Sequence, residues 1–217
     1  MEHTVRRRQL LAGLATGAIG VAGCLGDDEQ ASREYTLRDD FSDGLDDWDI
    51  EAHIGPHADL EDFEWSVDLT DDPVYAGEQA VSIFTEGSYD DGTVWIAQPI
   101  EVEAERKYTA EVSFQGWSPS ESFNERRRVV SYLGQSRPTA EDDFPQSGWN
   151  SSDEGTTAYG GLRETLDQAD GWFEYSFEWE STTIYADELW FAVGVTVVWE
   201  TDLTNALDDI EVHIESR

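Results

Sequence analysis

The sequence predicts an all-β protein, folded as an antiparallel β-sandwich or jelly roll. Short apolar and aromatic runs of alternating polarity recur along the chain, and turn sequences such as "SDG", "YDDGT" and "ADG" separate them. No internal repeat or sustained helical periodicity accompanies these runs. With 217 residues and 39% hydrophobic content, the chain can form one domain whose core lies between two packed sheets.

Ten segments between residues 35 and 217 show the strand pattern. In "YTAEVSFQGW" (residues 108–117), apolar side chains alternate with polar ones, so one face of the strand is expected to be buried. The predicted strands are Tyr35–Phe41, Trp48–Ile54, Phe63–Asp68, Gln79–Thr85, Thr93–Glu103, Lys107–Trp117, Arg127–Gly134, Trp172–Ser181, Glu188–Glu200 and Ala206–Glu215.

Two stretches depart from this pattern. Residues 160–170, "GGLRETLDQAD", could hold a short helix. Residues 134–161 are polar and irregular, and loops of this length within a compact domain are often functional.

The charge is strongly acidic. There are 48 acidic residues against 13 basic ones, the formal net charge is −35, and Lys107 is the only lysine. The acids are spread over the whole chain, which is typical of a protein adapted to very high salt, where the Debye length is roughly 3 Å at 1 M. Nucleic acid is excluded as a partner, because phosphate binding needs a basic patch.

The first 23 residues have the composition of an export signal. A basic segment with Arg6, Arg7 and Arg8 precedes an apolar run, and the arginines followed by "QLL" resemble a twin-arginine signal. "VAGC" (residues 21–24) resembles a lipobox, which implies cleavage before Cys24 and a lipid on its sulfur. The alternative is an uncleaved anchor helix. Residues 24–34 then form a polar tether to a domain on the extracellular face of the membrane.

The closing segment "ALDDIEVHIE", residues 206–215, contains a charged residue where an apolar one is expected. Asp208 has the same parity as Ile210 and Val212, which predicts that its carboxylate faces inward. An unpaired buried charge is very costly. Asp208 therefore accepts backbone N–H hydrogen bonds at a turn, or it binds a hard cation such as Ca²⁺.

Four segments together resemble the galactose-binding-like jelly rolls of carbohydrate-binding modules. They are Phe41–Gly44–Trp48, "VYAGEQAVSIF" (74–84), "PIEVEAERKYTAEVSFQG" (99–116) and "ALDDIEVHIE" (206–215). The opening also resembles laminin-G and concanavalin-type sandwiches, which is the alternative fold.

The jelly-roll resemblance implies a structural Ca²⁺ that bridges the first and last strands. Its ligands would be Asp208, a carboxylate near Phe41 and carbonyl groups around Gly77 to Gln79. Ser42 stands where many members carry an acid directly after the phenylalanine, so Asp40 or Asp43 would substitute.

Aromatic residues in polar loops are candidates for sugar binding. Trp117 ends a predicted strand, and Trp149 and Tyr159 lie in the long polar stretch, so they are predicted to stack on a glycan or, alternatively, to cap the open end of the sandwich. Asn124 and Asn150 are the predicted partners of the sugar hydroxyl groups.

No catalytic motif stands out among the acids and histidines. The sequence shows no recognisable Ser-His-Asp order, phosphate loop or H-E-x-x-H motif. We therefore expect a lipid-anchored, cell-surface module that binds a glycan or surface polymer without catalysis. The alternatives are a protein-binding adhesion or envelope-scaffolding module, and a glycan hydrolase, which would need two close carboxylates in a cleft.

Overall fold

The computed structural model describes residues 32–88, 92–119, 127–166, 171–197 and 202–217. Cys24, Asn124, the export signal and most of the tether lie outside these ranges. In chain order the elements are β1 (Glu34–Asp39), β2 (Asp49–His53), η1 (Leu60–Asp62), β3 (Trp65–Thr70), β4 (Ala80–Thr85), β5 (Gly92–Glu101), β6 (Tyr108–Trp117), β7 (Arg127–Gly134), η2 (Glu141–Asp143), η3 (Ser151–Asp153), β8 (Thr156–Thr157), β9 (Tyr159–Thr165), β10 (Phe173–Ser181), β11 (Glu188–Val197) and β12 (Leu203–Ser216).

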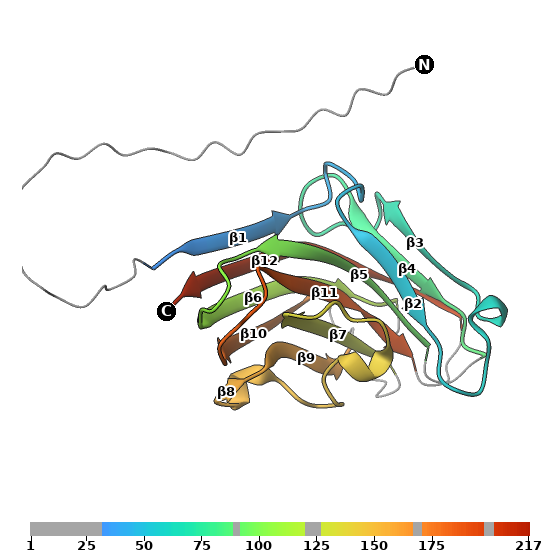
Figure 1. Ribbon diagram of the computed structural model, residues 1–217. Helices are drawn as coiled ribbons and strands as arrows, with labels where there is room; N and C mark the ends of the chain where they lie inside the picture. Colours follow the sequence, from blue (N-terminus) through green and yellow to red (C-terminus); the bar gives the residue numbers. More distant parts are fainter. Residues whose placement is uncertain (1–31, 89–91, 120–126, 167–170, 198–201) are drawn as a thin grey trace, which may run out of the picture. The chain divides into compact units, whose positions relative to one another are not determined.

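The strands form two sheets (Figure 1). The seven-stranded sheet has the order β3-β4-β12-β6-β10-β8, with β1 also paired to β12, and the five-stranded sheet has the order β2-β5-β11-β7-β9. Every pairing is antiparallel except the short contact between β10 and β8. The prediction of an all-β, antiparallel sandwich is confirmed.

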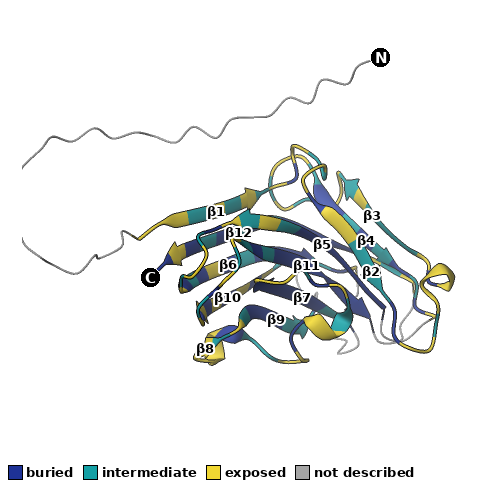
Figure 2. Ribbon diagram, viewed as in Figure 1, coloured by how far each residue is buried: buried dark blue, intermediate teal, exposed yellow. Residues whose placement is uncertain are grey.

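The main core lies between the two sheets. Inward-facing residues of β6, such as Val112 and Phe114, belong to the same buried cluster as Phe191 and Val193 of β11. Figure 2 shows how buried residues follow the central strands, while β1 alternates exposed and partly buried positions. This alternation follows from the period of two in β-strands, because each strand has one face on the core.

A second buried cluster lies on the other side of the five-stranded sheet. Trp95, Tyr132 and Phe144 are buried there, and Trp190 packs against them. The Arg137 guanidinium lies 5.0 Å from the centre of the Trp190 ring and pairs with Asp49 and Glu51. The stretch predicted as a long polar loop therefore supplies, through Phe144, part of a small outer core.

The two ends of the domain pair with each other, as the resemblance implies. β1 runs antiparallel to the second half of β12, from Glu34 opposite Glu215 to Asp39 opposite Ile210. Ser32 and Arg33 also bond to Ser216. The domain thus begins a few residues earlier than predicted, inside the expected tether.

The helix considered for residues 160–170 is wrong over its described part. Tyr159–Thr165 forms β9 and pairs with β7. Gly160 and Gly161 allow this pairing, because a Cβ atom would lie 2.6 Å from the Trp179 side chain at the first position and 2.2 Å from the Ser131 carbonyl at the second. Within the described residues, no helix is long and apolar enough to cross a membrane.

Candidate functional site

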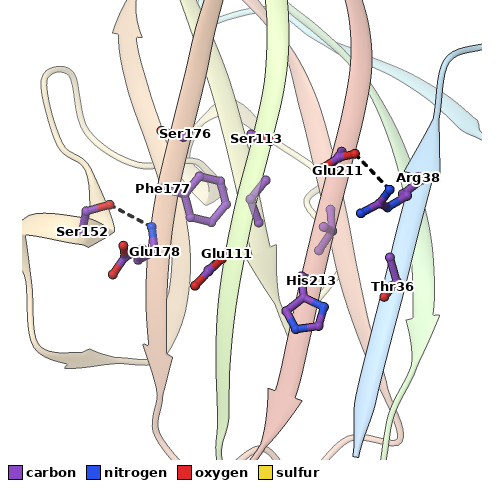
Figure 3. Close-up of a pocket in the computed structure, with 12 residues that line it drawn as sticks. Thr36, Arg38, Glu111, Ser113, Ser152, Ser176, Phe177, Glu178, Glu211 and His213 are labelled. Atoms are coloured by element: carbon purple, nitrogen blue, oxygen red, sulfur yellow. Dashed lines mark hydrogen bonds and ion pairs between the residues drawn. The ribbon is translucent and has the colours of Figure 1, made fainter.

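The main candidate site is a groove on the seven-stranded sheet, on the face turned away from the core. We call this face the outward face. The groove has a volume of about 290 Å³, and β1, β12, β6, β10 and η3 all contribute to it. Figure 3 shows its labelled side chains, which include Arg38, Ser113, Ser176, Glu178 and His213.

Strand register arranges the polar side chains of the groove in rows. In one row Thr36 lies opposite His213, His213 opposite Glu111, and Glu111 opposite Glu178. Side chains directly opposite on neighbouring strands share a face and have Cβ atoms roughly 4.5–5.5 Å apart. The row therefore presents hydroxyl, imidazole and carboxylate groups side by side across four strands (Figure 3).

The next row contains Arg38, Glu211, Ser113 and Ser176. The Arg38 guanidinium lies 3.3 Å from the Glu211 carboxylate, and their side chains are 70% and 47% exposed. Exposed pairs of this kind contribute little to stability, so both groups remain available to a ligand.

Glu111 and Glu178 form a pair of like charges on neighbouring strands. Like charges placed directly opposite each other destabilise a sheet. With Glu211 they give the groove three carboxylates against the one guanidinium of Arg38, so its local charge is mainly negative.

Side chains of the η3 segment close the groove along β10. The Ser151 hydroxyl donates to the Glu178 carbonyl at 2.8 Å, and the Glu178 N–H donates to Ser152 Oγ at the same distance. Asn150 donates to Glu164 and to the Ser176 carbonyl, and it accepts from the Ser152 N–H. These contacts account for the Asn150 amide without a ligand; its role as a sugar partner stays a prediction.

Asp208 does not share a face with Ile210, so that expectation is wrong. Asp208 lies opposite Gln115, whereas Glu211 lies opposite Ser113, so β12 contains one extra residue between them. Asp209 adopts a φ of 49° within this bulge. A bulge of one residue reverses the alternation, and Asp208 consequently lies on the outward face.

The loop between β3 and β4 covers Asp208, which is fully buried. The backbone N–H groups of Tyr75 and Ala76 donate to Asp208 Oδ2 at 2.8 and 3.0 Å, and the Asp209 N–H donates to Oδ1 at 2.7 Å. Burial raises the pKa of the Asp208 carboxyl above its ordinary value, and these amide bonds offset part of the rise. Backbone amides thus satisfy this carboxylate.

The implied Ca²⁺ ligands fit the structure in part. Asp40 reaches the same loop as Asp208, because its Oδ2 lies 2.9 Å from the position that a Cβ atom on Gly77 would take. Asp43 is exposed. Over the described ranges, no group of three or more His, Cys, Asp or Glu residues is placed to hold a metal ion. Any Ca²⁺ here would need carbonyl oxygens in addition to the two carboxylates.

The predicted aromatic residues fall into two places. Trp149 and Tyr159 are neighbours, with ring centroids 5.5 Å apart, and Tyr159 stacks on Tyr132 of the five-stranded sheet. Trp117 instead lies in the seven-stranded sheet, opposite Ala206. Their roles in glycan binding stay predictions, and Asn124 lies outside the described residues.

The sequence reasoning missed a second aromatic pair, Tyr75 and Trp172. Their ring centroids are 5.9 Å apart at an angle of 64°. Tyr75 is 51% exposed although its backbone N–H is bound to Asp208. The available signal was Tyr75 itself, an aromatic residue in the "DDPVYAGE" turn.

Comparisons with known proteins place the chain beside β-sandwich domains of low sequence identity. No family model and no curated protein matches it. Among solved structures, TmCBM61 in complex with β-1,4-galactotriose is 13% identical with a TM-score of 0.46, covering 79% of this chain and 92% of that one.

Two further structures are similarly related. The family 11 carbohydrate-binding module from Clostridium thermocellum is 13% identical with a TM-score of 0.45, covering 82% of this chain and 94% of that one. The K3 cleaved adhesin domain of Lys-gingipain from Porphyromonas gingivalis is 14% identical with a TM-score of 0.45, covering 84% and 99%.

Proposed function

We propose that this protein binds a glycan without catalysis, through the groove on the outward face. The observation that carries the proposal is the lining of that groove. Four adjacent strands present hydroxyl, carboxylate, imidazole and guanidinium groups toward one space of about 290 Å³. Sugar hydroxyl groups both donate and accept hydrogen bonds, and charged partners make the stronger ones.

Glu111 and Glu178 are the specific reason to consider a glycan hydrolase. A retaining glycosidase needs two carboxyl groups about 5–5.5 Å apart that flank the scissile bond. Here both carboxylates project from one face of one sheet, and both residues are exposed. They would approach a substrate from the same side, which favours binding over hydrolysis.

Exposed apolar side chains do not support a protein-binding surface. Among the described residues, the large exposed hydrophobic side chains are Ile50, Leu60, Tyr75 and Tyr185. They lie on four separate segments, whereas a docking surface needs a contiguous apolar patch.

Binding can be tested by affinity electrophoresis and calorimetry with soluble polysaccharides in multimolar salt, comparing Arg38→Ala with Arg33→Ala. Both arginines form exposed ion pairs, with Glu211 and with Glu103, but only Arg38 lines the groove. We expect Arg38→Ala to weaken binding about tenfold, or 1.4 kcal/mol, and Arg33→Ala to bind as the wild type does. Release of reducing sugar would favour the hydrolase, and failure to bind any glycan would remove the proposal.

We further propose that residues 1–23 direct export and that a lipid on Cys24 anchors the domain to the outer face of the membrane. The basic, apolar and small-residue order of this segment supports both. Mass spectrometry of the membrane-bound protein should show an N-terminal Cys24 that carries a lipid, and Cys24→Ala should carry no lipid and retain residues 1–23. A membrane-bound wild type that retains residues 1–23 without a lipid would contradict the lipid anchor.

We also propose that Ca²⁺ binds at the turn where Asp40 and Asp208 meet the loop between β3 and β4. Both carboxylates reach this loop, one from the segment after β1 and the other from β12. When bound, the ion would supply positive charge beside these carboxylates.

A further inference from the structure

The bulge in β12 extends the outward face beyond the groove. Register continues from Ser113 opposite Ser176 to Gln115, which lies opposite both Asp208 and Glu174. The groove and this neighbouring row therefore lie on the same face of the same three strands, and within the row Gln115 and Asp208 are buried while Glu174 is exposed. The length of ligand that the outward face can bind depends on which segment covers this row.

The loop between β3 and β4 lies over the Asp208 end of this row. Its position is set by the amide bonds from Tyr75 and Ala76 to the buried Asp208 carboxylate. Because these bonds involve backbone atoms, they hold the loop without using the Tyr75 ring. The ring remains half exposed and contacts Trp172 edge to face.

Trp172 comes from the other side of the same surface. It directly precedes β10, whose first residue, Phe173, packs against the core, and its contact with Tyr75 places its ring beside the loop between β3 and β4. Phe173 also lies opposite Gly116, so this last paired position is followed by Trp117, which ends β6, and by Trp172, which precedes β10. Tyr75 and Trp172 thus form an aromatic contact at the end of a polar surface, and Trp117 ends the neighbouring strand.

The distance along β10 from Ser176 to Trp172 is four residues, or about 13 Å at roughly 3.3 Å per residue. This is longer than one sugar ring. Glu174 lies along this path and Glu178 lies just beyond Ser176, and both carboxylates would repel an acidic polymer. Binding sites of this kind combine aromatic surfaces with a few well-placed polar groups.

We propose that Tyr75 and Trp172 form the aromatic platform of an extended site that takes a neutral oligosaccharide. One sugar ring lies against the platform, and the following units run along the outward face toward Glu111 and Arg38. Asp208 is a positioning residue, because it holds the loop that carries Tyr75. This inference rests on the proposed glycan binding and names its class of ligand.

The test measures binding of a neutral galactan, a xylan and a mixed-linkage glucan by calorimetry and by tryptophan fluorescence. We expect the wild type to bind at least one of them. Tyr75→Ala and Trp172→Ala should each weaken that binding at least tenfold. Tyr185→Ala is the matched control, because Tyr185 is 72% exposed and does not line the groove, and it should bind as the wild type does.

Trp172→Phe controls for the possibility that the alanine variant fails to fold. It keeps an aromatic ring, so it should bind within about threefold of the wild type but lose most of the ligand-induced fluorescence change. Polygalacturonate is the acidic counterpart and should bind at least tenfold more weakly than the neutral glycans. Equal binding of polygalacturonate would overturn the assignment to neutral glycans.

The results also separate this inference from the proposed function. If the glycans bind and both alanine variants bind equally well, the platform is wrong while glycan binding stands. If the wild type binds none of the glycans, both the platform and the proposed glycan binding are wrong.

Discussion

Two buried tyrosines connect side-chain burial to the pH dependence of stability. Burial raises the pKa of Tyr108 and of Tyr132 to about 12, from about 10 in an unfolded chain. Tyr108 is fully buried, and its hydroxyl donates to the Glu103 carbonyl. The folded protein therefore keeps both protons at pH values where the unfolded chain begins to lose them.

We expect the free energy of unfolding to fall as the pH rises from about 10 to about 12. Stability from a raised pKa is fully present below the unfolded value and is lost through the folded value, on the order of 2–3 kcal/mol for each tyrosine. Chemical unfolding followed by tryptophan fluorescence measures this. Tyr132→Phe should remove about half of the fall. A stability that does not change over this pH range would contradict the assignment.

The proposed Ca²⁺ makes a separate prediction for Asp40 and Asp208. An ion that binds only the folded state stabilises it by mass action. A chelator at fixed salt should therefore lower the melting temperature. Asp40→Asn should abolish this response, while Asp46→Asn, at an exposed acid outside the proposed ligands, should retain it. Superimposable melting curves with and without chelator would count against the ion.

At the scale of elements, β12 shows how a bulge reverses which residues of one strand point toward the core. Its first half pairs with β4 and its second half with β1, and the bulge at Asp208 and Asp209 lies between them. Reading "ALDDIEVHIE" with an unbroken period of two puts Asp208 on the wrong face. The prediction that the Asp208 carboxylate needs hydrogen-bond partners or a cation was sound, but the face to which its side chain points depends on the pairing of β12 with β6.

The β9 strand makes a prediction about close packing. Gly161 has a φ of 155°, and a Cβ atom there would lie 2.2 Å from the Ser131 carbonyl oxygen. We expect Gly161→Ala to lower the free energy of unfolding by about 3 kcal/mol, because a strand backbone cannot yield as a side chain can. Gly155→Ala is the control, since nothing lies within 4 Å of its Cβ position. Equal stability of the two variants would contradict this packing.

For the whole molecule, the net charge of −35 should make stability depend on salt. The Debye length falls from about 10 Å at 0.1 M to about 3 Å at 1 M, so salt screens repulsion between the acids. Circular dichroism melts in KCl should show a melting temperature that rises over this range. Sucrose, which is uncharged, serves as the control for non-ionic stabilisation. A melting temperature independent of KCl would argue against adaptation to salt.

The sequence alone determined the strand pattern and the sandwich, and the jelly-roll resemblance implied the pairing of the domain's first and last strands. All ten predicted strands are present, because alternation between core and solvent is a local property that each strand carries in its own residues. Composition likewise gave the acidic character, and the alternation of residues around Asp208 indicated that its carboxylate must be neutralised.

The tertiary structure alone decided where the functional groups meet. Thr36, His213, Glu111 and Glu178 come from four strands and form one row only through register. Tyr75 and Trp172 are distant in sequence and touch because a buried carboxylate holds a loop over a bulge. Period-two patterns specify which side of a strand is apolar, but hydrogen-bond register between strands sets which polar side chains become neighbours.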